Sequence, residues 1–132
     1  MVLAGFVLGC VSLVAAQAEG AETKYDFEVV KPGEVYFGSG KHPKAPAVMT
    51  ADDVWAAIPE YKRILEDKLT DDDPRYHLLM KKAAERFSKA LKKLAKRDSH
   101  DMLGEAGSIK ALGKKQIPDV TTEMIKLVTR DQ

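Results

Sequence analysis

Apolar residues recur at helical spacing in two neighbouring stretches of the chain. In the first stretch, from residue 59 to 69, the apolar positions are Tyr61, Ile64, Leu65 and Leu69. In the second, from about residue 74 to 97, they are Tyr76, Leu79, Met80, Ala83, Phe87, Ala90, Leu91 and Leu94. Spacings of three and four residues place side chains on one face of a helix, so the pattern predicts two amphipathic helices.

An acidic turn separates the two predicted helices. The sequence Thr70-Asp71-Asp72-Asp73-Pro74 ends with an aspartate suited to cap a helix and a proline suited to its first turn. Helices joined by so short a turn pack as an antiparallel hairpin, which we expect over about residues 52–97. A calcium loop spreads its ligands over about 12 residues with a glycine and a closing glutamate. The acidic run lacks these features, so we expect no metal site there.

Short strands and a final helix complete the predicted elements. Residues 25–30 alternate apolar and polar side chains, and residues 35–37 are apolar, which indicates an N-terminal strand pair followed by a loop to residue 46. Further short strands are expected at about residues 101–112, and a last helix at about 121–129 with Thr121 as its cap. Thr50, with Asp53 three residues later, resembles a capping box before the hairpin. The expected fold class is α+β, with the helical hairpin projecting from a small β body.

The first 18 residues contain no charged side chain. They end in Ala16-Gln17-Ala18, and small residues three and one before the cut are what a signal peptidase accepts. We therefore expect residues 1–18 to be an export signal that is cleaved after Ala18. Val7-Leu8-Gly9-Cys10 loosely resembles a lipoprotein box, so a lipid anchor on Cys10 is the alternative. Cleavage after Ala18 removes the one cysteine and with it any disulfide.

The net charge of +1 hides a division of charge between the two arms of the hairpin. Residues 52–73 hold eight acidic and three basic residues, a net charge of −5. Residues 74–97 hold nine basic residues and one acidic residue, a net charge of +8. Two interpretations stay open: the arms pair their charges with each other, or the basic arm offers a face to an anionic partner or client. The balanced charge of the whole chain argues against nucleic acid as a partner.

The sequence contains no catalytic or cofactor motif. The three histidines, His42, His77 and His100, lack the paired spacing of metal ligands. Ser39 lies between two glycines but lacks the strand and helix that frame a nucleophile elbow. No phosphate- or dinucleotide-binding glycine pattern occurs. We therefore expect a protein that is not an enzyme and needs no cofactor.

The order of these elements resembles the Skp/OmpH family of periplasmic chaperones for outer-membrane proteins. Three segments carry the resemblance: residues 54–64 (VWAAIPEYKRI), 83–109 (AAERFSKALKKLAKRDSHDMLGEAGSI) and 117–128 (IPDVTTEMIKLV). They resemble the start of the family's first long helix, the end of its second, and its closing strand with the C-terminal helix. The family-like domain would then be residues 47–132, preceded by an N-terminal part at 19–46.

The resemblance implies a trimer in which short strands of three chains form a β body and the hairpins project from it as coiled-coil tentacles. A hairpin with a few short strands buries little apolar surface alone, which also favours an oligomer. The implied function is that of a periplasmic, ATP-independent holdase for unfolded or partly folded envelope proteins, with contact to a membrane surface. The alternative is a non-catalytic structural or assembly module of the envelope that docks on one folded partner.

The candidate client-binding residues are apolar and basic side chains of the hairpin, namely Tyr61, Leu65, Tyr76, Phe87, Lys81, Lys82 and Lys89. For the apolar ones the alternative is burial between the two helices, where amphipathic helices place their apolar faces.

Overall fold

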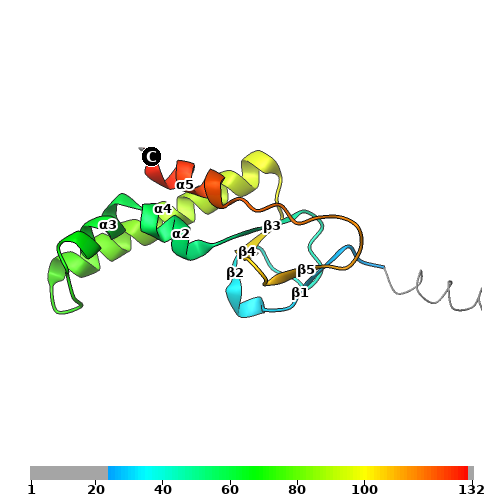
Figure 1. The fold of residues 1–132 in the computed structure, drawn as a ribbon, viewed down its shortest axis with the longest axis horizontal. Coiled ribbons are helices and arrows are strands. Elements are labelled where there is room, and N and C mark those ends of the chain that lie inside the picture. The colour runs from blue at the N-terminus through cyan, green and yellow to red at the C-terminus, as the bar shows by residue number, and fades with distance from the viewer. Residues whose placement is uncertain (1–23, 131–132) are drawn as a thin grey trace, which may run out of the picture.

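The computed structural model describes residues 24–130. The expected export signal at residues 1–18, its cleavage site after Ala18 and the candidate lipid anchor Cys10 lie outside this part of the chain. The described chain combines helices with small sheets, which confirms the α+β expectation (Figure 1). In chain order the elements are β1 (Phe27–Val29), the 3-10 turn η1 (Pro32–Glu34), β2 (Val35–Phe37), β3 (Pro46–Met49), α2 (Ala51–Ala57), α3 (Pro59–Glu66), α4 (Pro74–Asp98), β4 (Met102–Glu105), β5 (Ile109–Ala111) and α5 (Thr121–Thr129). None of the helices in residues 24–130 is long and apolar enough to cross a membrane.

The 25-residue helix α4 is the longest element, and both α3 and α5 pack along it (Figure 1). Asp73 caps α4 as expected, because its carboxylate accepts a hydrogen bond from the backbone N–H of Arg75 at 2.8 Å. The chain before the acidic turn forms two helices, α2 and α3, rather than one arm. Ile58 between them has extended backbone angles, since the following Pro59 disfavours helical geometry in the residue before it.

Five strands form two small sheets. β1 pairs antiparallel with β5, and β4 lies between β2 and β3. β4 is antiparallel to β2 and parallel to β3, so α2, α3 and α4 together form the crossover between two parallel strands. The two expected N-terminal strands are present as β1 and β2, but they do not pair with each other: each pairs with a strand from the C-terminal half of the chain. The turn at residues 31–34 determines where these strands end and begin, but not which strands they pair with.

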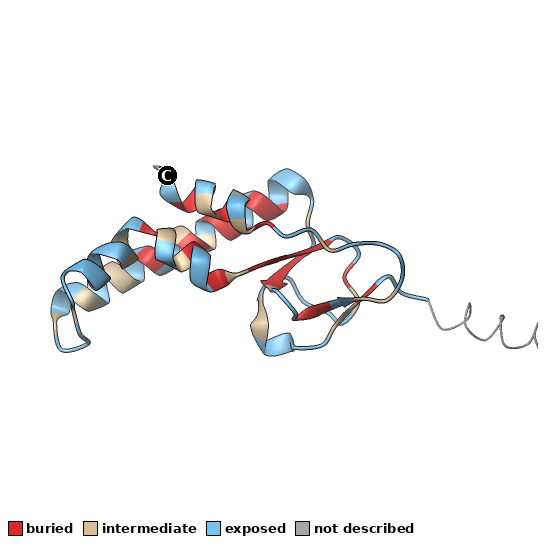
Figure 2. Ribbon diagram, in the orientation of Figure 1, coloured by how far each residue is buried: buried red, intermediate tan, exposed pale blue. Residues whose placement is uncertain are grey.

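The main core lies where α2, α4 and α5 meet β3 and β4 (Figure 2). Its most deeply buried large side chains are Met49, Ile58, Leu94, Leu103 and Met124. A second, smaller cluster formed by Phe27, Val48, Met102 and Ile109 joins the two sheets. Exposed residues dominate the end of the α3–α4 pair that lies farthest from the sheets (Figure 2). Packing therefore anchors the helices at one end and leaves the other end in solvent.

The start of α5 is held against the end of β3. The N–H of Val120 donates to the carbonyl of Val48 at 2.8 Å. Thr121 does not cap α5 as expected: it is the first helical residue, and its N–H and hydroxyl donate to Asp119 at 2.9 and 2.6 Å. The hydroxyl oxygen of Thr121 accepts the N–H of Thr50 at 2.9 Å. The N-cap position of α5 is Val120, and Thr121 instead links Asp119 with Thr50, which lies far away in the sequence.

At Gly38, the chain after β2 closely approaches the backbone at the start of β4. It has a φ of +90°, and a Cβ at this position would clash with the backbone carbonyl oxygen of Asp101 and lie 3.0 Å from the Cα of Met102. We expect Gly38→Ala to lower the free energy of unfolding by about 2–4 kcal/mol, from left-handed strain plus the clash. Urea unfolding followed by circular dichroism measures the change. Gly33→Ala is the matched control because nothing lies within 4 Å of its added Cβ, and equal losses in both variants would contradict the close approach.

Candidate functional site

Four aromatic side chains form a row across α3, α2, α4 and β2. The ring of Trp55 stacks on Phe87 with the centroids 5.4 Å apart, and it meets Tyr61 edge-on at 5.6 Å. Tyr36 meets Phe87 edge-on at 5.8 Å. Phe87 is only 7% exposed and is covered by rings from α2 and β2, so it is not an exposed side chain of the hairpin and follows the alternative of burial instead. Tyr61 and Trp55 are half-buried and Tyr36 is exposed, so the outer side of the row reaches the surface.

Glu105 fixes Tyr36 and the start of α2 together. Its Oε1 accepts the phenol O–H of Tyr36 at 2.7 Å and the N–H of Ala51 at 3.1 Å. Partial burial, and then the bonded Glu105 carboxylate, raise the pKa of Tyr36, so its phenol stays a donor. The capping box expected at Thr50 is wrong, since Thr50 makes no side-chain cap and Glu105 satisfies the free N–H instead.

Two leucines on the helices are the most exposed large apolar residues in the described part of the chain. Leu65 on α3 is 56% exposed and Leu78 on α4 is 55% exposed. Tyr76 is half-buried near the acidic turn, where its ring meets His77 edge-on at 5.4 Å. Leu65 and Tyr76 therefore remain accessible as proposed contacts. Sequence reasoning missed Leu78 because it lies outside the apolar stripe of α4, and that departure from the stripe was the signal that could have revealed it.

The lysines of α4 stand on its solvent face. Lys81, Lys82 and Lys89 are exposed, as expected of contact residues, and so are Lys92, Lys93 and Lys96. The ion pairs that join the two arms in the described chain are Glu60–Arg86 and, at the turn, Asp73–Arg75. Charge pairing between the arms is thus limited to these two places. The six lysines keep their ammonium groups available to a partner.

Arg86 joins three helices. Its Nε and Nη2 donate to the two carboxylate oxygens of Glu60 on α3 at 2.9 and 3.0 Å. Its Nη1 donates to the carbonyl of Arg130, just after α5, at 2.8 Å and approaches that of Val128 at 3.4 Å. The hydrogen bond from Arg86 is the main cause that lowers the pKa of Glu60. A cation at a helix C-terminus also satisfies carbonyls that have no partner within the helix.

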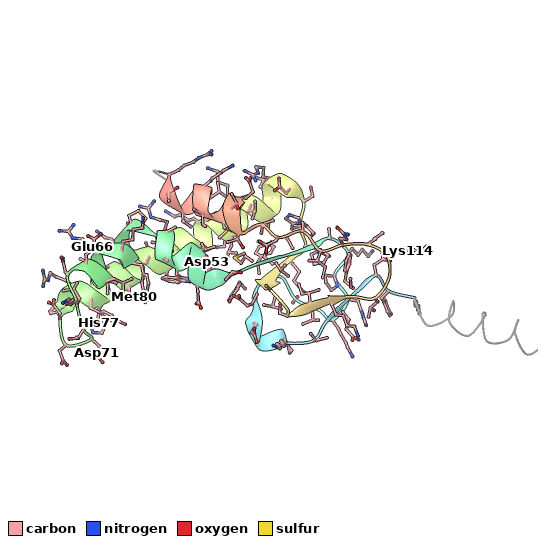
Figure 3. The ribbon with its side chains drawn as sticks, in the orientation of Figure 1. Asp53, Glu66, Asp71, His77, Met80 and Lys114 are labelled. Carbon is pink, nitrogen blue, oxygen red and sulfur yellow. The ribbon has the colours of Figure 1, made fainter. Side chains whose placement is uncertain are left out.

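The three histidines lie against backbone carbonyls. One ring nitrogen of each lies within hydrogen-bond distance of a backbone carbonyl, at Phe27 for His42, Asp71 for His77 and Ala45 for His100. Within residues 24–130, no group of three or more His, Cys, Asp or Glu side chains is placed to hold a metal ion. Figure 3 shows His77 and Asp71 at the end of the helices farthest from the sheets, near Glu66 and Met80. What this end offers chemically is a surface of apolar and charged side chains.

Comparison with family models, with curated proteins and with solved structures gives no match to this chain.

The ion pair between Glu60 and Arg86, which we call the junction, can be tested by protonating Glu60. Because the native pKa of Glu60 lies below the ordinary value of 4.5, its stabilising effect is complete above that pH and is lost as the pH falls through the native pKa. Glu60→Gln should lower the free energy of unfolding at neutral pH by about 1–3 kcal/mol and flatten its fall in acid. Urea unfolding at a series of pH values checks both effects. Glu85→Gln is the control, since Glu85 is exposed on α4; an acid dependence as steep in Glu60→Gln as in the parent would contradict the junction.

Proposed function

We propose that this protein is an ATP-independent holdase of the Skp/OmpH type that binds unfolded or partly folded envelope proteins in the periplasm. The observation that carries the proposal is the apolar surface of α3 and α4, where Leu65 and Leu78 are more than half exposed. Tyr61 and Tyr76 add half-buried rings on the same two helices. Unfolded clients present apolar segments without a fixed shape, and separate apolar side chains on a helical surface suit such clients better than a deep pocket does.

The order of elements supports the same proposal. A strand leads into helices that turn back at an acidic cap, and two strands and a last helix follow. The finer architecture that we propose is an antiparallel hairpin of α3 and α4 that projects from the β body as a short tentacle. The lysines of α4 (Lys81, Lys82 and Lys89 among them) flank the apolar side chains. Charges around apolar contacts keep such a surface soluble when no client is bound.

We further propose that three chains associate through the β body. The strands have three or four residues each, and sheets this small have little stability of their own. β2 lies at the edge of its sheet, and an edge strand presents backbone groups to which another chain can pair. Tyr36 in the centre of β2 is 38% exposed, so an apolar side chain is available at the same edge.

The holdase proposal is tested by diluting a urea-denatured outer-membrane β-barrel protein into buffer and following its aggregation by light scattering. We expect the parent protein to suppress aggregation, and the double variant Leu65→Ser/Leu78→Ser to lose roughly half of that effect, because about 1.5–3 kcal/mol of burial is lost per leucine. Both side chains are more than half exposed, so the variant should unfold within about 0.5 kcal/mol of the parent.

Val30→Ser is the matched control for client binding. Val30 is 47% exposed but follows β1 in the β body, away from α3 and α4. Equal losses in the control and the double variant would contradict a site on the helices. If the parent protein does not suppress aggregation but captures one folded partner in a pull-down, the holdase proposal is contradicted. The alternative of a structural or assembly module then takes its place.

The trimer is tested by light scattering coupled to size-exclusion chromatography at micromolar concentration. We expect three times the mass of one chain, and we expect Tyr36→Lys to shift the protein toward monomer, because a charge would lie at the proposed strand edge. A stable monomer of the parent protein would contradict association through the β body.

A further inference from the structure

Two adjoining hollows lie in the β body, at the end opposite the acidic turn of α3 and α4. The first, of about 380 Å³, is bordered by Phe27, Lys44, Pro46, His100, Lys115 and Gln116, among others. The second, of about 330 Å³, is bordered by Lys24, Tyr25, Asp26, His42, Pro43 and the same two lysines, Lys44 and Lys115. The two hollows share these two bordering side chains, and we refer to them together as the groove between residues 42–46 and the loop after β5. Figure 1 shows that loop passing close to the start of the described chain.

The inner side of the groove is apolar. Phe27 is 4% exposed and Pro46 is fully buried, so both are fixed by the core behind them. Pro43 is also buried. The ring of Tyr25 is 45% exposed and stacks on the imidazole of His42 with the centroids 3.8 Å apart and the planes within 7°. Phe27, Pro43 and Pro46 are almost entirely covered, so the apolar surface that an acyl chain can reach here is mainly the ring of Tyr25.

The rim of the groove is cationic. The ammonium group of Lys115 lies 3.0 Å from the carboxylate of Asp26. The carboxylate of Asp98, which borders the first hollow, lies 3.1 Å from the guanidinium of Arg97. Both acidic groups at the rim therefore have a partner. The ammonium groups of Lys24 and Lys44 have no carboxylate partner within residues 24–130, and that of Lys24 lies 5.7 Å from the centroid of the Tyr25 ring. Two cations without an acidic partner among residues 24–130 thus face a groove whose bordering acids, Asp26 and Asp98, are paired.

Two imidazoles at the groove have a fixed orientation. In each, Nδ1 donates to a backbone carbonyl, that of Phe27 at 3.0 Å for His42 and that of Ala45 at 3.1 Å for His100. A carbonyl oxygen only accepts, so the hydrogen of the neutral ring is on Nδ1 and Nε2 is left for another partner. The groove therefore offers directional polar groups beside the lysines.

We propose that this groove binds an amphiphile with a phosphate headgroup, with the phosphate at Lys24 and Lys44 and the apolar part against the ring of Tyr25. Ammonium groups bind phosphate as point charges, and two of them without an acidic partner among residues 24–130 match its double charge better than the single charge of a carboxylate. The Tyr25 ring distinguishes such a ligand from inorganic phosphate. This site is separate from the surface of α3 and α4 and does not depend on the holdase proposal.

Isothermal titration calorimetry of the protein with short-chain dihexanoyl phosphatidic acid, below its micelle concentration, tests the proposal. We expect saturable binding with one site per chain, and at least tenfold weaker binding in the double variant Lys24→Gln/Lys44→Gln. Lys114→Gln is the matched control: Lys114 lies beside Lys115 on the same loop, at the end of the molecule opposite the acidic turn (Figure 3), but does not border the groove. Its affinity should stay within twofold of the parent. NMR signals of the His42 and Tyr25 rings should shift on binding.

Three further probes decide what is recognised. Inorganic phosphate should bind at least tenfold more weakly than the amphiphile, and equal affinity would overturn the role of the Tyr25 ring. Dihexanoyl phosphatidylcholine, whose phosphate is capped by a cation, should not bind. Sedimentation with phosphatidylcholine vesicles that contain phosphatidic acid distinguishes the sources: binding that is lost in the double variant identifies a membrane lipid, and vesicle binding absent beside tight binding of the soluble ligand identifies a free phosphate ester. Equal losses in the double variant and Lys114→Gln, or no binding of any probe, would overturn the site.

Discussion

The guanidinium of Arg86 is the group on which the arrangement of the helices depends. It holds Glu60 of α3 with two hydrogen bonds and reaches the carbonyl of Arg130 at the end of α5. α3 has only eight residues, and a helix of that length is not stable by itself in water. Its attachment to α4 by this ion pair and by the buried side chains of Ile64 and Ala83 therefore determines whether the apolar surface at Leu65 is presented at all.

The β body depends on a different constraint, the central place of β4. This strand pairs with β2 on one side and β3 on the other, and Glu105 at its end also receives Tyr36 and the start of α2. β3 and β4 are parallel, so their pairing requires the whole helical segment to leave and return. The β body and the helices are therefore not independent units: the helices close the sheet, and the sheet sets where they begin and end.

Sequence patterns predicted the local structure of the residues in which they occur. The Asp73-Pro74 pair marked the start of α4, and apolar spacing indicated the long helix and the strands on either side. Contacts between segments that lie far apart in the sequence could not be predicted from it. Nothing near Phe27 indicates that its strand pairs with Ala111 rather than with β2, and nothing near Thr121 indicates a hydrogen bond from Thr50. Phe87 follows the helical spacing like its neighbours, but only the packing of Trp55 and Tyr36 makes it a core residue.

The same distinction applies to the two surfaces. The lysines of α4 were visible in the sequence because they follow one another along a helix, and their exposure agrees with the charge pattern. The groove in the β body could not be predicted from the sequence, because Lys24, Lys44 and Lys115 come from three separate segments. Their meeting depends on the pairing of β1 with β5 and on the bond between Lys115 and Asp26.

The parallel crossover has a consequence for how such a chain can change over evolution. The register of β3 with β4 runs from Pro46–Met102 to Met49–Glu105 and involves no residue of the helices between them. Matching turns can therefore be inserted into α3 and α4, or removed from them, without altering the sheet, and each residue added to both arms extends the reach by about 1.5 Å. Such insertions and deletions would change the distance between the exposed leucines of α3 and α4 and the β body while the pairing of β3 with β4 stays the same.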